Sequence, residues 1–268
     1  MKLKKRVQSE ISKVSEIAGY LWQRGWCERN AGNISIDLTG LINIAKGDLH
    51  KRKYVNNPVT KEAAQRTIFI TGAGERLRDL IHAPEAASCI IHIDEEAQGY
   101  YIVWGGEGKP MFRPTSEFAS HVALHLFNAR EGNGMRCVVH THPVELIAIS
   151  HHPTLGQDEK ALNKALWSML PEIRIYVPKG ISIAPYELPG SEALALRTIE
   201  GLKYRDVILW SKHGALAVGK DAIEAFDFID VANKGAIIYL KCLQAGYPPV
   251  GMTEEEVRGL DVFIKNGN

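Results

Sequence analysis

Three histidines that follow apolar runs are the residues best suited to chemistry. His140 and His142 stand in the run MRCVVHTHP, and His213 ends a second run, VILWSKH. Successive side chains of a strand point to opposite faces, so two histidines separated by one residue point the same way. Three neutral imidazoles on strand ends can bind one metal ion and leave a coordination position open, as in catalytic zinc sites. A bare HxH motif can equally be two histidines with local hydrogen bonds.

A second pair of histidines competes for the metal. His121 and His125 are four residues apart, which places them on one face of a predicted helix. The sequence between them, VAL, lacks the glutamate of the HExxH zinc motif. We therefore interpret His121 and His125 as packing or surface histidines.

Two turns supply candidate binding residues. Asn30, Gly32 and Asn33 precede an alternating strand, and asparagine and glycine tolerate the left-handed backbone that such a turn requires. Gly72 and Gly74 follow a β-branched strand, where consecutive backbone N–H groups can face a phosphate. Each segment could also be an ordinary turn.

The segment Thr115-Ser116-Glu117 is predicted to open a helix that runs to about Asn128. Thr115 or Ser116 can cap this helix, and Glu117 falls in its first turn, where the helix dipole favours a carboxylate. Capping alone would explain the segment, so a catalytic role depends on its context.

The composition narrows the class of protein. Among 268 residues, 32 Lys and Arg nearly balance 31 Asp and Glu, so no global charge favours nucleic acid or an anionic membrane. The four cysteines, Cys27, Cys89, Cys137 and Cys242, form no CxxC pair, which fits a reduced cytosol better than a disulfide framework. No apolar stretch has the length of a signal-peptide core or a membrane span. We expect a cytoplasmic protein.

Periodicity predicts a single domain over residues 1–268, a mixed and mainly antiparallel sheet covered by helices. Consecutive strands with short connections favour antiparallel pairing, whereas parallel strands need long crossovers. Residues 41–66 are predicted to be a peripheral excursion. Helices are predicted at 7–21, 144–150, 162–169, 191–204, 221–245 and 253–264, and strands at 67–71, 88–93, 99–104, 173–177, 181–184, 207–210 and 215–218.

These motifs together resemble the class II aldolase/adducin family. The HxH pair, the later histidine, the TSE segment and the run ERNAGN follow the family's order, and the match extends from about Leu21 to Gly246. The resemblance implies an α/β/α sandwich with one Zn²⁺ per subunit on His140, His142 and His213.

The resemblance also implies the roles of the remaining site residues. It implies that Glu117 is the catalytic carboxylate beside the metal. In the rhamnulose branch of the family a second glutamate reaches in from a neighbouring subunit of a fourfold ring, and the resemblance places Glu172 at the matching position. That branch tends to have serine where this chain has Ala73, which would remove one hydroxyl contact to a phosphate and affect the phosphate affinity. Substrate and phosphate binding fall to Asn30, Gly32, Asn33, Gly72, Gly74, Thr115 and Ser116.

The implied activity is metal-dependent cleavage of a small sugar phosphate by a homotetramer, with L-rhamnulose 1-phosphate as the expected substrate. Zinc would stabilise the charge left by the broken carbon–carbon bond, and a carboxylate would move the proton. L-fuculose-phosphate aldolase and pentulose-phosphate 4-epimerase activities are alternatives on the same fold. A non-catalytic adducin-like scaffold and a zinc hydrolase are alternatives of other classes.

Overall fold

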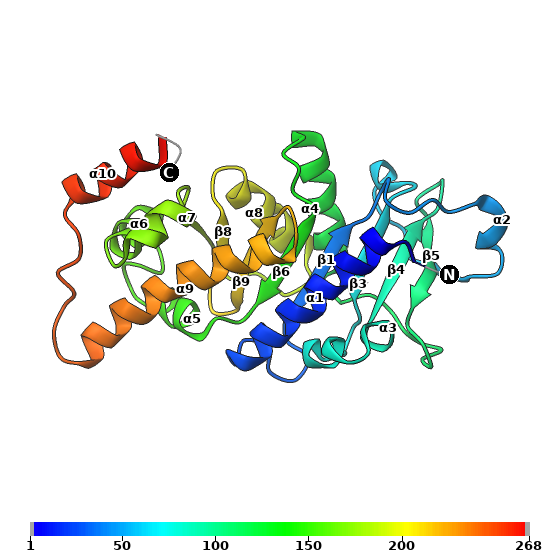
Figure 1. Cartoon of the computed structure of the whole chain (residues 1–268), viewed down its shortest axis with the longest axis horizontal. Coiled ribbons are helices and arrows are strands. Elements are labelled where there is room, and N and C mark those ends of the chain that lie inside the picture. Colours follow the sequence, from blue (N-terminus) through cyan, green and yellow to red (C-terminus); the bar gives the residue numbers. More distant parts are fainter. Residues whose placement is uncertain (1–2, 266–268) are drawn as a thin grey trace. The chain divides into compact units, whose positions relative to one another are not determined.

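The computed structural model describes residues 3–265, in which nine strands belong to one mixed sheet accompanied by helices (Figure 1). The pairings within each part of the sheet are antiparallel, apart from the parallel pair β7 and β8. The predicted α/β class with a mixed, mainly antiparallel sheet is confirmed.

Contacts divide the chain into two compact units, each assembled from separate stretches. The first runs up to Thr141 and adds Pro189–Ala195 and Val218–Ala225, while the second takes His142–Leu188, Leu196–Ala217 and the chain from Phe226 onward. The single domain over residues 1–268 stays a prediction.

The first unit carries the strand order β2-β5-β4-β3-β1-β6. Its strands β3, β4 and β5 begin and end within a residue of the prediction. Its elements are α1 (Lys5–Gln23), β1 (Asn33–Asp37), α2 (Lys46–Leu49), β2 (Lys53–Asn56), the 3₁₀ turn η1 (Lys61–Ala63), β3 (Thr67–Thr71), the 3₁₀ turn η2 (Leu77–Ile81), α3 (Pro84–Ala87), β4 (Ser88–Ile93), β5 (Gly99–Gly105), α4 (Phe118–Glu131) and β6 (Cys137–Thr141).

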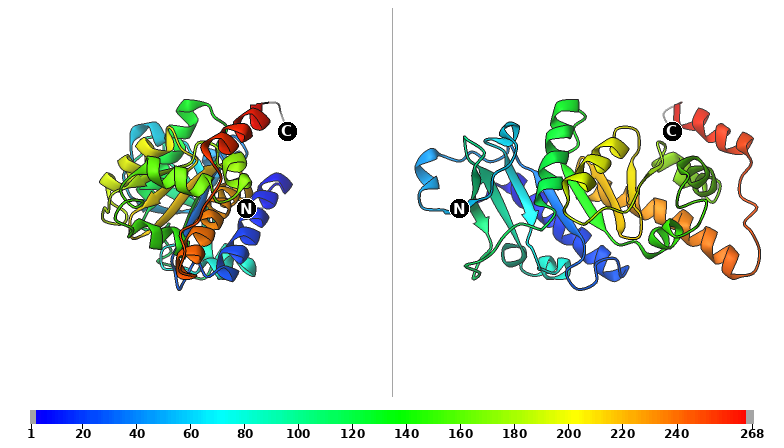
Figure 2. Two further views of the ribbon diagram at one scale, coloured as in Figure 1. Left: turned by 90° about the vertical axis from the view of Figure 1, so that its left-hand side faces the viewer. Right: turned by 180° about the vertical axis from the view of Figure 1, so that it is seen from behind.

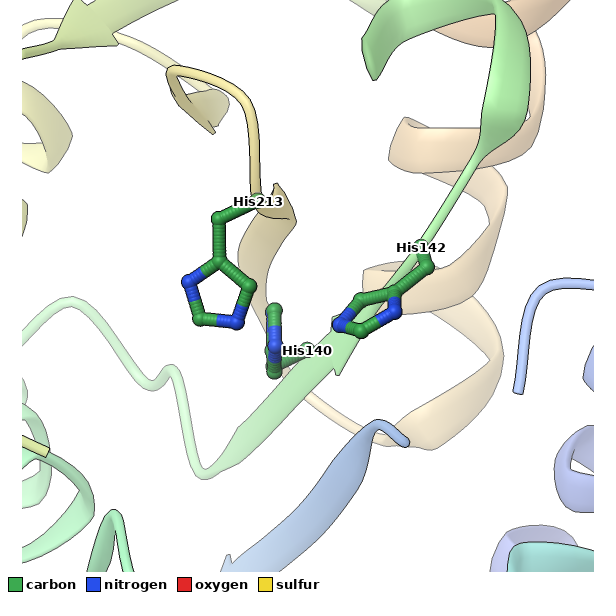
Figure 3. A group of neighbouring side chains, drawn as sticks. All are labelled: His140, His142 and His213. Carbon is green, nitrogen blue, oxygen red and sulfur yellow. The ribbon is translucent and has the colours of Figure 1, made fainter. Parts of the chain in front are cut away.

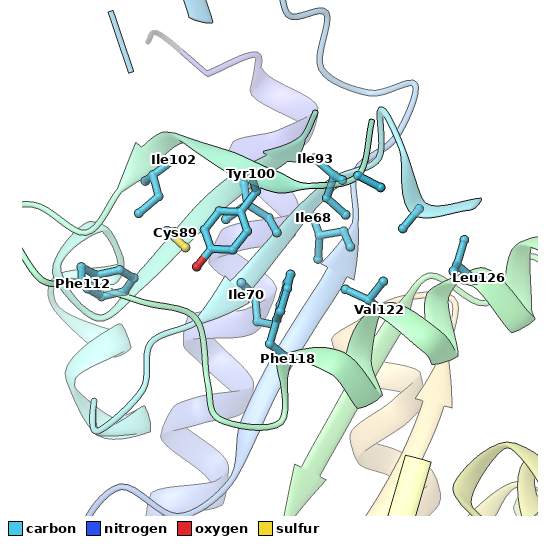
Figure 4. Close-up of a cluster of buried hydrophobic side chains, with 13 residues drawn as sticks. Ile68, Ile70, Cys89, Ile93, Tyr100, Ile102, Phe112, Phe118, Val122 and Leu126 are labelled. Carbon is cyan, nitrogen blue, oxygen red and sulfur yellow. The ribbon is translucent and has the colours of Figure 1, made fainter. Parts of the chain in front are cut away.

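Helices α1 and α4 cover opposite faces of this part of the sheet. The apolar stripe that predicted α1 is entirely buried, and Figure 2 shows α1 beyond the strands when the molecule is seen from behind. On the other face, Phe118, Val122 and Leu126 of α4 pack against Ile68 and Ile70 of β3 (Figure 4). Apolar side chains on both faces are expected for a sheet covered on both sides. Within this unit the α/β/α layering is therefore as expected.

Strand β1 departs from that apolar pattern on one face. All five of its residues are buried, yet Asn33, Ser35 and Asp37 are polar and share one face because their spacing is two. Asn33 is paired with His140 of β6 in the antiparallel register. The face of β1 that carries these polar residues is therefore also the face of His140.

The second unit carries the strand order β9-β8-β7. Ser191, predicted as a cap, lies in the stretch of the first unit that begins α8 and accepts a hydrogen bond from the N–H of Leu194 at 3.2 Å. The elements of this unit are α5 (Val144–Ser150), α6 (Glu159–Trp167), α7 (Pro171–Tyr176), β7 (Ile181–Ala184), β8 (Val207–Trp210) and α10 (Glu254–Lys265), while α8 (Glu192–Leu202), β9 (Gly214–Gly219) and α9 (Ala222–Gln244) have residues in both units.

Three sequence expectations were wrong in detail. The segment 173–177 is not a strand but lies mostly in α7, because Pro171 at the first helical position presets the backbone and outweighs the β-branched residues that follow. The 41–66 segment is peripheral, as predicted, but it contains the unpredicted strand β2, a largely exposed edge strand that pairs with β5. Helix α4 begins one residue after Glu117, which occupies the N-cap position without a side-chain cap.

All four cysteines are free, and Cys27, Cys89 and Cys137 are buried. Burial raises the pKa of the Cys27 thiol to about 11 and also raises the pKa of the Cys89 and Cys137 thiols. Among residues 3–265, no helix combines the length and apolar content needed to cross a lipid bilayer.

Gly32 permits a close approach between β1 and β6. Its φ is +76°, and a Cβ built there would lie 2.9 Å from the carbonyl oxygen of His140. Gly74 has almost the same φ, +75°, but nothing within 4 Å. We expect Gly74→Ala to lower the free energy of unfolding by about 1 kcal/mol through the left-handed backbone. Gly32→Ala should cost about 1–3 kcal/mol more, because the strands must move apart.

Urea unfolding of the two variants measures this difference. Equal destabilisation would mean that the contact with the carbonyl of His140 does not constrain β1.

Candidate active site

Three histidines converge on one point. The ligand nitrogens of His140, His142 and His213 all lie within 4.8 Å of one another, and Figure 3 shows the three rings turned toward a common centre. His140 is the penultimate residue of β6, His142 follows that strand, and His213 lies in the turn between β8 and β9. The structure thus brings together the three histidines predicted as metal ligands.

The position of His213 depends on a tight hairpin turn. The N–H of His213 donates to the carbonyl of Trp210 at 3.0 Å, while Lys212 adopts a left-handed φ of 64°. The N–H of Lys212 donates to Ser150 Oγ at 2.8 Å, which ties the turn to the end of α5. The indole of Trp210 lies 5.1 Å from the His213 ring and is held by Thr198. His213 is therefore fixed by backbone and packing.

The protonation state of His213 suits a metal ligand. Burial, together with a smaller effect of the nearby His142, lowers its pKa to about 4. The two rings lie 5.3 Å apart. A neutral imidazole offers a lone pair, and first-row metals such as Zn²⁺ bind imidazole nitrogen. The donor set and its spacing fit a single divalent cation.

Glu117 is the carboxylate beside this cluster. It is buried, with 5% of its surface exposed, and its Oε1 lies 4.0 Å from His140 Nε2. The Nδ2 group of Asn33 donates a hydrogen bond to Glu117 Oε2 at 3.1 Å. Glu117 is thus held close to a metal-ligand candidate and oriented by an amide, which is the geometry expected of an acid–base group.

His121 and His125 have a different role from the metal cluster. Both are fully buried on the sheet side of α4, and both bond to Ser35 Oγ, at 2.6 Å from His121 Nδ1 and 2.7 Å from His125 Nε2. They are core histidines, which confirms the packing interpretation over the surface one. The sequence analysis did not identify Ser35. A serine between two polar positions of an otherwise apolar strand could have indicated a buried polar row.

The predicted phosphate turn lies beside the TSE segment. Gly72 forms an antiparallel bridge with Pro114, next to Thr115. The N–H groups of Gly72 and Ala73 already donate to the carbonyls of Ala87 and Arg113, both at 2.9 Å. Gly74 therefore stays the candidate backbone donor of this turn. Thr115 is buried and Ser116 is exposed.

The remaining candidates are more exposed. Asn30 lies exposed in the turn before β1, and Gly32 is half-buried two residues later. Glu172 is exposed as the second residue of α7. An exposed position is compatible with the predicted action of Glu172 in a neighbouring subunit.

Comparison with known proteins assigns the family. Residues 12–240 match the family described as class II aldolase and adducin N-terminal domain. A rhamnulose-1-phosphate aldolase of Bacteroides thetaiotaomicron is 39% identical over 94% of this chain and 93% of its own length. The chain belongs to the class II aldolase and adducin family. These relatives also place it among the aldolases of that family, which are lyases.

Further relatives agree with this assignment. A rhamnulose-1-phosphate aldolase of Mannheimia succiniciproducens is 31% identical over 84% of this chain and 83% of its own. The crystal structure of a sugar-phosphate aldolase from Thermotoga maritima superposes with a TM-score of 0.72, at 30% identity, over 92% of this chain and the whole of that one. An L-fuculose 1-phosphate aldolase matches with a TM-score of 0.61 over 96% of each chain, but at 18% identity it supports the fold alone.

The histidine cluster generates a test by metal analysis. His213→Ala removes one of three imidazoles, so we expect the variant to lose stoichiometric zinc after dialysis. His151→Ala is a matched control, because His151 is exposed and lies outside the cluster. Elemental analysis of the purified proteins measures the difference. Full zinc occupancy in His213→Ala would mean that other residues hold the ion.

The core histidines generate a prediction about acid stability. Burial lowers the pKa of His121 to about 3 and that of His125 to about 4, whereas an unfolded histidine titrates near 6.5. The unfolded chain therefore takes up protons first as the pH falls, and stability present above pH 6.5 is lost below it. Each histidine should cost about 2 kcal/mol of unfolding free energy between pH 8 and pH 5.

Urea unfolding at both pH values measures this loss. His125→Leu should lose about 2 kcal/mol less than the native chain, and an unchanged pH dependence would contradict a neutral His125.

Proposed function

We propose that this protein is a zinc-dependent aldolase that reversibly cleaves L-rhamnulose 1-phosphate to dihydroxyacetone phosphate and L-lactaldehyde. The observation that carries the proposal is the carboxylate of Glu117, held 4.0 Å from a histidine of the three-histidine cluster. The choice of sugar rests on the relatives named rhamnulose-1-phosphate aldolase, which match nearly the full chain.

His140, His142 and His213 would hold the metal. Bound there, a divalent zinc supplies Lewis-acid stabilisation of the negative charge that develops on the ketose oxygen when the carbon–carbon bond breaks. The chain's own residues must then orient the sugar and move two protons.

Glu117 is the candidate group that donates a proton to carbon. Cleavage leaves an electron pair on the carbon next to the carbonyl, and a proton must reach that carbon to complete dihydroxyacetone phosphate. Glu117 as the carboxylic acid would donate it, and in the synthetic direction its carboxylate would remove it. Its burial keeps bulk water from competing for the proton.

Glu172 is the candidate group that accepts the second proton, which leaves the C4 hydroxyl as the aldehyde forms. Its side chain is exposed in this subunit. We propose that it acts in a neighbouring active site of a homotetramer, so that a carboxylate at the surface of one subunit completes the site of another.

Polar groups beside the TSE segment would bind the rest of the substrate. The bridge between Gly72 and Pro114 places the glycine turn beside Thr115. We propose that the turn of Gly72 and Gly74 binds the phosphate with Thr115 and Ser116. Asn30, Gly32 and Asn33 would shape the sugar side. With Ala73 in place of serine, this phosphate site depends more on the hydroxyls of Thr115 and Ser116. We also propose that the chain forms a single domain and that it acts in the cytoplasm.

The test is the release of dihydroxyacetone phosphate from L-rhamnulose 1-phosphate. We expect turnover that disappears on chelation and returns with Zn²⁺. Glu117→Gln should keep the metal and lose about 10²–10⁴-fold in kcat, because the amide cannot exchange a proton at neutral pH. Glu131→Gln is the control, since Glu131 is exposed at the end of α4.

Other outcomes would change the proposal. Turnover of L-fuculose 1-phosphate instead would keep the site and change the sugar. A zinc-loaded protein without activity on either sugar phosphate would overturn the aldolase proposal.

A further inference from the structure

A chain of buried hydrogen bonds ends at Glu117. In order, it links His125 Nε2 to Ser35 Oγ at 2.7 Å, Ser35 Oγ to His121 Nδ1 at 2.6 Å, and His121 Nε2 to Asn33 Oδ1 at 2.5 Å. The last bond runs from Asn33 Nδ2 to Glu117 Oε2 at 3.1 Å. Exposure along this chain nowhere exceeds 6%.

Each member of the chain is placed by secondary structure. His121 and His125 stand one helical turn apart on α4, and Asn33 and Ser35 stand two residues apart on one face of β1. Side chains one turn apart on the helix therefore face side chains two residues apart on the strand, across the interface between helix and sheet. This match lets one serine hydroxyl bridge two imidazoles.

The direction of the chain follows from the donors that each group has. A hydroxyl carries one proton, so Ser35 can donate to only one of the two imidazoles and must accept from the other. An ionised carboxylate only accepts, so Asn33 turns its NH₂ group toward Glu117 and its oxygen toward His121. His121 must then carry its proton on Nε2 and accept from Ser35 at Nδ1. His125 donates from Nε2 to Ser35.

The far end of the chain supports the same direction. His125 Nδ1 is buried and has no hydrogen-bond partner in the described structure. In the direction given above this atom is a bare lone pair, whereas in the reverse direction it would be an N–H group. A buried N–H without an acceptor is rarer and more costly than an acceptor that lacks a donor. Both ends of the chain thus favour the direction in which every proton points toward Glu117.

We propose that His121, Ser35 and His125 are positioning residues for the reaction, because they lock the Asn33 side chain with its NH₂ group on Glu117. The oxygen and the NH₂ group of the Asn33 amide are nearly equal in size. Without the hydrogen bonds of these three residues, the amide can turn by 180° and place its oxygen against the carboxylate. That arrangement sets two acceptors against each other. The functional part of this inference rests on the proposed role of Glu117.

Neutron diffraction from a deuterium-exchanged crystal of the zinc-loaded protein tests the geometry without any assay. We expect deuterium on Nε2 but not on Nδ1 of both His121 and His125, and two deuteriums on the side of Asn33 that faces Glu117. Deuterium on Nδ1 of either ring, or an Asn33 oxygen that faces Glu117, would overturn the proposal. The result does not depend on which sugar the protein cleaves.

Kinetics of serine variants test the consequence. Ser35→Ala removes the central hydroxyl, and we expect kcat to fall about tenfold or more while KM changes much less than kcat and zinc content stays unchanged, since Ser35 itself lies outside the proposed substrate and metal sites. Ser35→Thr keeps a hydroxyl and should restore most of the activity. Ser120→Ala is the matched control, because Ser120 is a buried serine of α4 outside the chain of hydrogen bonds.

The two experiments separate the possible failures. Equal kcat values in Ser35→Ala, Ser120→Ala and the native enzyme would overturn the positioning role. A fall in Ser35→Ala that Ser35→Thr does not recover, or that raises KM equally, would mean a general packing role instead. If the native protein cleaves no sugar phosphate, the proposed function fails while the neutron result still decides the geometry.

Discussion

The central constraint of this structure is the burial of a polar row on strand β1. Asn33, Ser35 and Asp37 face the interior between the sheet and α4, where an unpaired polar group costs about 1–3 kcal/mol. Asn33 and Ser35 form hydrogen bonds with imidazoles, and Asp37 forms an ion pair with the guanidinium of Arg66 at 2.5 Å. The register of β1, the rotation of α4 and the place of Glu117 are tied together by these bonds.

The sequence was sufficient to predict that His140, His142 and His213 cluster, because the signal of each histidine is local. His140 and His142 are separated by one residue, and His213 follows an apolar run of the same kind, so each stands at a strand end whose existence is easy to predict. The roles of His121 and His125 were harder. Their helical spacing was visible, but their partner Ser35 lies 86 and 90 residues away in the sequence. Only the packing of α4 on β1 brings these groups together.

The fold was predicted best where periodicity and flanking residues agreed. The strands around Phe69 and Ile91 and the helix at α1 combine a clear period with glycine or polar boundaries. The segment PEIRIY, now α7, contains β-branched residues that favour a strand, and its proline favours a helix start. A single sequence cannot weigh these two preferences, because the outcome depends on the neighbours that cover the segment. The phosphate turn was similarly ambiguous, since the backbone partners of Gly72 and Ala73 are Ala87, at the end of α3, and Arg113, in the loop before α4.

The burial of the cysteines determines which thiol would react first in an oxidising solution. Peroxide and disulfide reagents attack the thiolate, and a thiol with a raised pKa inside apolar packing offers almost none. Cys27, Cys89 and Cys137 are therefore chemically quiet, whereas Cys242 of α9 is partly accessible. Oxidative damage to this chain would begin at one thiol in a helix that supplies no metal ligand, so loss of a free thiol and loss of the histidine cluster would proceed as separate events.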